Sequence, residues 1–162
     1  MASYVELHSR LSARIFGALA ATLGSGITSA QTVSLAASSA AGAVAILEAL
    51  PVAGAPALPE TLEREAKWAA AIFAGLASGL TTITQAQITT LANAAVAALS
   101  AVQAAVAAAA GSISTEGLLL QIDVAVEVFA GLVQGLASIT SAETTAIAAS
   151  AAAAASAIVA AQ

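Results

Sequence analysis

Apolar side chains recur along the chain with the period of one helix face. Phe73, Leu76 and Leu80 are three and four residues apart, the spacing of a stripe along one side of an α-helix. The same stripe returns at Phe16, Leu19 and Leu23 and at Phe129, Leu132 and Leu136. The pattern predicts three equivalent helices, each followed by a corner containing Gly, Ser or Thr.

A helix-start signal follows each stripe. It consists of an Ile, then a Thr, with Gln or Glu three residues after the Thr. In such a capping box the Thr hydroxyl accepts a hydrogen bond from a free backbone N–H, and the Gln or Glu side chain reaches back to the Thr backbone. Each cap contributes about 1 kcal/mol to helix stability. The predicted caps are Thr28 with Gln31, Thr84 with Gln87, and Thr140 with Glu143.

The stripes and caps repeat at one distance. The three Phe residues are 57 and 56 residues apart, and the three cap Thr residues are 56 and 56 apart. A period of this length indicates stacked helical pairs. We predict an all-α single domain over 1–162, with three tandem αα-hairpin repeats at 1–56, 57–112 and 113–162. The six helices are predicted at 3–23, 29–50, 59–80, 85–110, 115–136 and 141–161.

The second helix of each repeat is rich in Ala. In the middle repeat its predicted stripe is small, so it can pack only if helix axes come close together. That stripe is Ile88, Leu91, Ala95, Leu99, Val102 and Val106. The connection from Pro51 to Pro56 ends one repeat, because Pro cannot continue a helix. A closed bundle and an open short stack are both compatible with this pattern.

Composition changes the picture of the surface. Hydrophobic residues make up 60% of the 162 residues, but aromatic residues only 3%, and charged residues 8%, against about 25% in an ordinary globular domain. Much of the surface is therefore expected to be covered by sister subunits, by lipid or by another apolar surface. The net charge of −5 with four basic residues disfavours nucleic-acid binding. The absence of Cys excludes disulfides and thiolate sites.

A membrane location is the main alternative that this composition raises. Residues 15–47 and 68–115 contain no charge, and helices of about 20 residues can span a bilayer. The pairs Gly75 with Gly79 and Gly131 with Gly135 match the spacing of closely packed membrane helices. Against this, the charged stretch from Glu63 to Lys67 lies inside a predicted helix and is costly in lipid. A packed assembly of copies of this chain is the preferred interpretation.

The sequence shows no catalytic grouping. His8 is the only His, and a lone His without Cys is not a metal site. Glu63 with Lys67 is an i, i+4 pair typical of a solvated helix face. We predict no catalytic residue, no cofactor and no metal site. The residues predicted to serve packing or interfaces are Phe16, Phe73, Phe129, Gly75, Gly79, Gly131, Gly135, Trp68 and Tyr4.

The N-terminus reads M-A-S-Y-V-E-L-H-S-R-L, and a later stretch reads L-E-R-E-A-K-W-A. On these residues the chain resembles small structural proteins of tailed-phage virions, although it is richer in Ala, less charged and triplicated. The resemblance implies a non-enzymatic capsid or tail component, assembled in the host cytoplasm with itself and with other structural subunits. Phasins, which coat polyester granules, are a second analogue by composition.

Three hypotheses follow for the function. The first is a virion structural protein that self-assembles through uncharged Ala-rich helical faces as a homo-oligomer. The second is a phasin-like protein that binds a lipid or granule surface through amphipathic helices. The third is an integral membrane protein of the holin kind.

Overall fold

The structure is a computed structural model that describes residues 3–50 and 60–162. The prediction of an all-α chain is confirmed, and the described residues contain six α-helices and one short 3₁₀ helix, η1. These are α1 (Tyr4–Leu19), η1 (Gly24–Gly26), α2 (Ser29–Ala49), α3 (Glu60–Ala77), α4 (Gln85–Ala110), α5 (Thr115–Leu132) and α6 (Ser141–Ala160). The predicted connection from Pro51 to Pro56 lies outside the described residues.

A capping box opens each of the helices α2, α4 and α6. The backbone N–H of Thr84 donates to Gln87 Oε1 at 2.8 Å, and the N–H of Gln87 donates to Thr84 Oγ1 at 3.2 Å. Thr28 with Gln31, and Thr140 with Glu143, make the same reciprocal bonds. The preceding Ile residues are half-buried against the core, as a hydrophobic staple requires. Three residues of local sequence thus set where each of these helices begins.

Loss of one cap should be measurable on its own. Thr84→Ala is expected to lower the free energy of unfolding by about 1 kcal/mol, because the Gln87 N–H loses its acceptor. Thr90→Ala is the matched control, since Thr90 is an exposed residue inside the same helix and should gain a few tenths of a kcal/mol from helix propensity. Urea denaturation of both variants checks this, and equal effects would contradict a role for the cap.

The first helix of each pair ends earlier than predicted. The sequence stripe placed the ends at residues 23, 80 and 136, but the helices end at Leu19, Ala77 and Leu132. Leu80 and Leu136 therefore lie in the corners between helices. The reason is that Gly79 and Gly135 adopt positive φ values of 78° and 76°, which an α-helix does not contain.

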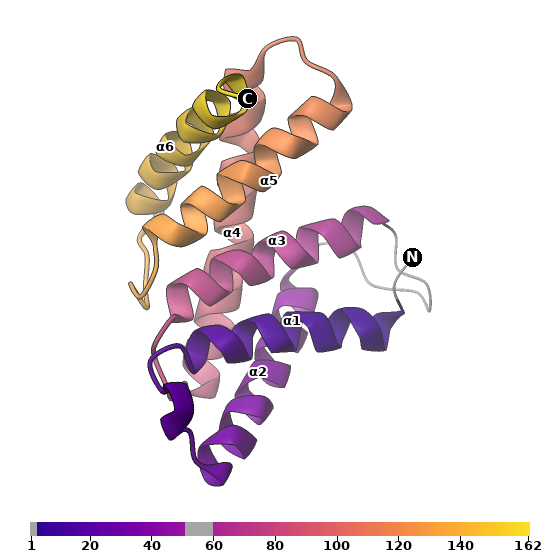
Figure 1. The fold of residues 1–162 in the computed structure, drawn as a ribbon. Helices are drawn as coiled ribbons and strands as arrows, with labels where there is room; N and C mark the ends of the chain where they lie inside the picture. The colour runs from indigo at the N-terminus through magenta and orange to yellow at the C-terminus, as the bar shows by residue number, and fades with distance from the viewer. Residues whose placement is uncertain (1–2, 51–59) are drawn as a thin grey trace.

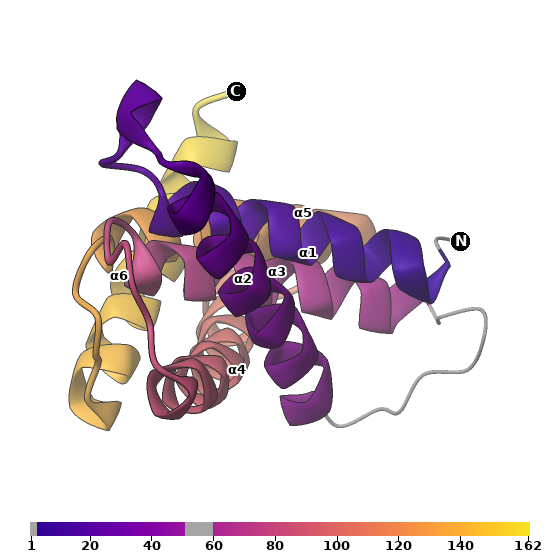
Figure 2. The same cartoon turned by 90° about the horizontal axis from the view of Figure 1, so that it is seen from below.

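The three helical pairs form an open stack. Helix α3 packs against both α1 and α5, and α4 packs against both α2 and α6. Within the described residues, α1 and α5 do not pack against each other, and neither do α2 and α6. Figure 1 shows α1, α3 and α5 one above another, with α4 running behind them. Figure 2 views α4 nearly along its axis, across the direction of α1, α3 and α5. The open stack is therefore the arrangement observed, not a closed ring of three pairs.

The core lies between these two layers. The whole predicted α4 stripe from Ile88 to Val106 is buried, and Phe73 and Phe129 are fully buried. Side chains are small enough for close packing: a Cβ added to Gly42 in α2 would lie 3.1 Å from Ile15 and 3.4 Å from Phe73. The predicted α5 stripe is wrong at its end, because Leu132 and Leu136 are exposed.

Candidate assembly surfaces

Each later helical pair is fastened to the one before it at its corner. The N–H of Gly79 donates to the Ala18 carbonyl at 2.8 Å, and the N–H of Thr81 donates to the Leu19 carbonyl at 3.1 Å. One repeat later, Gly135 donates to Gly75 at 2.9 Å and Ala137 donates to Leu76 at 3.0 Å. The last carbonyls of α1 and α3, which have no partner inside their own helices, are thus satisfied by the following pair. We call this two-bond contact the clasp.

The clasp was not predicted from the sequence. It holds Thr81 and Ala137 at φ values of 58° and 62°, a region that residues other than Gly rarely adopt. Neither residue type predicts such a turn. The available signal was the recurrence of Gly-Leu at 79–80 and 135–136 at the repeat distance.

The predicted Gly contacts divide into two kinds. Gly75 is a true close approach, because a Cβ there would lie 2.5 Å from the carbonyl oxygen of Ala130 on α5. Gly79 and Gly135 serve the clasp through their positive φ. Gly131 was predicted to be a packing site, but a Cβ there would meet nothing within 4 Å. Within the described residues, α5 packs against α3, α4 and α6, and none of them covers Gly131.

The predicted aromatic anchors also differ from one another. Trp68 on α3 is buried, and its Nε1–H donates to Asp123 Oδ1 on α5 at 2.9 Å. Tyr4 is exposed on α1. Arg14 on α1 reaches Glu127 on α5 at 3.5 Å across the face of α3, with both side chains about half exposed. An exposed pair of this kind contributes little to stability, so Trp68 is the stronger link between the second and third pairs.

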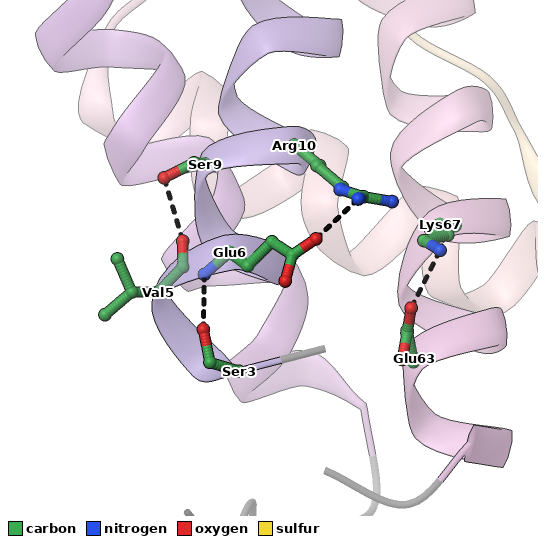
Figure 3. A network of polar contacts seen from close by, with 7 residues as sticks. All are labelled: Ser3, Val5, Glu6, Ser9, Arg10, Glu63 and Lys67. Carbon is green, nitrogen blue, oxygen red and sulfur yellow. Dashed lines mark hydrogen bonds and ion pairs between the residues drawn. The ribbon is translucent and has the colours of Figure 1, made fainter. Parts of the chain in front are cut away.

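Charge is concentrated in one layer. All four basic residues and seven of the nine acidic residues lie on α1, α3 and α5; Glu48 and Glu143 are the other two. Figure 3 shows the starts of α1 and α3, where Arg10 pairs with Glu6 and Lys67 pairs with Glu63. The layer of α2, α4 and α6, which we call the uncharged layer, exposes mainly Ala, Ser and Thr.

The helices of the uncharged layer are also candidates for crossing a membrane. Each of α2, α4 and α6 is long and apolar enough to cross a membrane, judged by length and composition, and between 22% and 39% of the tested windows is buried inside the fold. On α4 the exposed positions include Ala97, Ser100, Ala104, Ala107 and Ala108. These side chains remove little apolar area from water, so they gain little from lipid but allow another helix to approach closely.

Over residues 3–50 and 60–162, few side chains that could bind a metal or take part in catalysis lie close together. No three His, Asp or Glu side chains gather there as metal ligands. His8 lines a shallow groove between α1 and α2 with Phe16, Ala36 and Ala40. The Ser9 and Ser12 hydroxyls beside it donate to carbonyls one turn earlier in α1, each at 2.8 Å.

Glu143, at the start of α6 in the uncharged layer, has a pKa that is shifted from its ordinary value. The backbone N–H of Thr140 and then its hydroxyl hydrogen-bond the carboxylate, and these bonds hold the pKa of Glu143 below its ordinary 4.5. A lowered folded-state pKa means that the stabilisation is present above the ordinary pKa and is lost as the pH falls through the folded value.

The same box with an amide supplies the control. Glu143→Gln should be less stable than the wild type at neutral pH, because it lacks the charged acceptor at the start of α6. As the pH falls through the lowered pKa of Glu143, the two proteins should converge, since a protonated Glu resembles Gln. Thermal melting from neutral to acidic pH measures this, and a difference that does not change with pH would contradict it.

Comparison of the chain with protein family models, with curated proteins and with solved structures finds no match. The function must therefore be inferred from the surfaces described above.

Proposed function

We propose that this chain is a non-enzymatic structural protein that self-assembles through uncharged helical faces, as a component of a phage virion. The observation that carries the proposal is the separation of charge between the two layers. A folded chain that keeps nearly all its charges on α1, α3 and α5 leaves the uncharged layer suited to burial against other subunits. The virion assignment is supported by the resemblance of the N-terminus and of the stretch around Trp68.

A charge placed on the uncharged layer tests the proposal. Ala97 is exposed on α4, so Ala97→Lys should leave the helix content and melting of the monomer unchanged. The variant should form smaller assemblies than the wild type, because a buried unpaired ammonium is costly at an interface. Thr61→Lys, which adds the same charge at an exposed position of α3, is the control. Light scattering compares the masses, and equal assemblies from all three proteins would contradict the proposal.

The length and apolar composition of α2, α4 and α6 favour a second candidate function, that of a protein bound to or inserted in a lipid surface. Flotation with phospholipid vesicles and with hydrophobic granules decides between the two. The structural proposal predicts that the chain is recovered without detergent and stays out of the floating fraction. Co-flotation at moderate salt would favour the lipid-binding function instead.

A further inference from the structure

The C-terminal end of the stack keeps the residues that seat another helical pair. Leu132 is 54% exposed, whereas Leu76 and Leu19, one and two repeats earlier, are fully buried. Ile158 on α6 is 43% exposed, whereas Ile46 and Val102 at the same repeat position are fully buried. Terminal units of repeat proteins normally carry a polar outer face. We call Gly131, Leu132 and Ile158 the C-terminal end surface.

The opposite end presents the complementary surface. Phe16 is half-buried on α1, while Phe73 and Phe129 are fully buried, and the ring of Phe73 lies against Gly42 of the preceding pair. Ala13, Gly17 and Ala36 are likewise exposed where their counterparts in the second and third pairs are buried. We call Ala13, Phe16 and Ala36, which line one groove between α1 and α2, the N-terminal end surface.

The two ends also carry the unused halves of a clasp. Two local backbone bonds recur in all three corners, but in the described part of the chain the N–H groups of Thr22 and Gly24 donate to no backbone acceptor. These are the positions of Gly79 and Thr81 in the second pair. At the other end, the Leu132 carbonyl accepts no backbone bond, whereas the Leu19 and Leu76 carbonyls each accept one. One end offers the donors and the other the acceptor.

Backbone conformation favours one of the two clasp bonds between copies. Gly24 has φ 53°, close to the 58° of Thr81 and the 62° of Ala137, so it is already in the clasp conformation. Thr22 lacks the positive φ of Gly79. The bond from Gly24 to the Leu132 carbonyl of another copy is therefore the expected one.

Small residues at both ends allow the required approach. Inside the chain, α3 and α5 approach each other closely where Gly75 meets Ala130. The corresponding positions at the two ends are Gly131 and Gly17, and a Cβ on either would meet nothing within 4 Å. Gly17 and Gly131 also border one groove over α3 within the chain, and each is open to a second copy that continues the stack.

Charge does not decide which ends meet. Glu127 pairs with Arg14, Asp123 accepts from Trp68 and Arg10 pairs with Glu6, all inside the chain. Ser9 and Ser12 make the N-terminal end more polar than its counterparts, but their hydroxyls are already bonded within α1 and need no water.

From these contacts we infer that copies of this chain stack head to tail, with the N-terminal end surface of one copy seated on the C-terminal end surface of the next. The contact repeats the one that joins helical pairs inside the chain. The inference rests on the proposed self-assembly and names the surfaces that perform it. A contact between two different surfaces does not close on itself, so it extends into a filament or closes into a ring.

Two variants that each block one end test the inference. Ala13→Glu blocks the N-terminal end surface and Leu132→Glu blocks the C-terminal one; both positions are exposed, so each variant should keep the wild-type circular dichroism and melting. Val33→Glu is the control, because Val33 and its counterparts Thr89 and Thr145 are all exposed on the outer side of the stack. Light scattering gives the molar mass of each protein alone and of a 1:1 mixture of the two blocked variants.

Head-to-tail stacking predicts that each blocked variant alone is monomeric, that their mixture forms dimers and nothing larger, and that Val33→Glu assembles like the wild type. Dimers from Ala13→Glu alone would overturn the inference in favour of paired C-terminal ends. Wild-type assemblies from both blocked variants would overturn it while leaving self-assembly through other faces intact. A monomeric wild type would overturn both the inference and the proposed function.

Discussion

Phe73→Ala is expected to destabilise the protein by about 3–5 kcal/mol, since it removes a fully buried aromatic ring and leaves a cavity. The ring lies between α3 and the preceding pair, where its Cζ would be 3.4 Å from a Cβ at Gly42. A loss of this size is a large part of the roughly 5–15 kcal/mol that holds a domain folded.

The repeat provides a control at the same position. Phe16→Ala removes the same side chain from α1, where no pair precedes it and the ring is only half-buried. Its cost should be about 1–2 kcal/mol. Urea denaturation at one low protein concentration measures both, because association would raise the apparent stability. Equal losses would show that the preceding pair does not cover Phe73.

Gly75→Ala is expected to cost about 2 kcal/mol, although Ala favours helices over Gly. The new Cβ would lie 2.5 Å from the Ala130 carbonyl oxygen and 3.0 Å from its Cα, and backbone atoms cannot rotate away. Separation of α3 from α5 by overpacking costs about 1–3 kcal/mol or more, which outweighs the gain in propensity of up to about 1 kcal/mol.

Gly131→Ala should have the opposite sign. This residue holds the same repeat position on α5, but a Cβ there meets no atom within 4 Å. The monomer should therefore gain up to about 1 kcal/mol from helix propensity. Thermal melting of both variants at low concentration compares them. Changes of the same sign would contradict the close contact between α3 and α5.

The sequence alone predicted the features of the fold that depend on residues close together in the chain. The caps at Thr28, Thr84 and Thr140 each involve a partner three residues away, and the α4 stripe follows the helix period. The bonds from Gly79 and Thr81 to the end of α1 join residues far apart in the sequence, so no local pattern predicted them. The bond between Trp68 and Asp123 joins residues 55 apart, and no local pattern marks it.

The two Gly-x-x-x-Gly stretches show the limit of a repeated motif. Gly75 and Gly131 occupy the same position in identical local patterns, yet one lies against a backbone and the other faces open space. The difference comes from the position of each pair in the stack. A repeat predicts the shape of each unit, while the neighbours of that unit decide which of its faces stay exposed.

The proposed function and the head-to-tail stacking both require the chain to associate with itself, and the molar mass of the wild-type protein in detergent-free buffer tests this most directly. Size-exclusion chromatography with light scattering, run over a range of concentrations, should give masses above the 15.5 kDa of one chain that rise with concentration. A single species of 15.5 kDa at every concentration into the micromolar range would contradict both proposals.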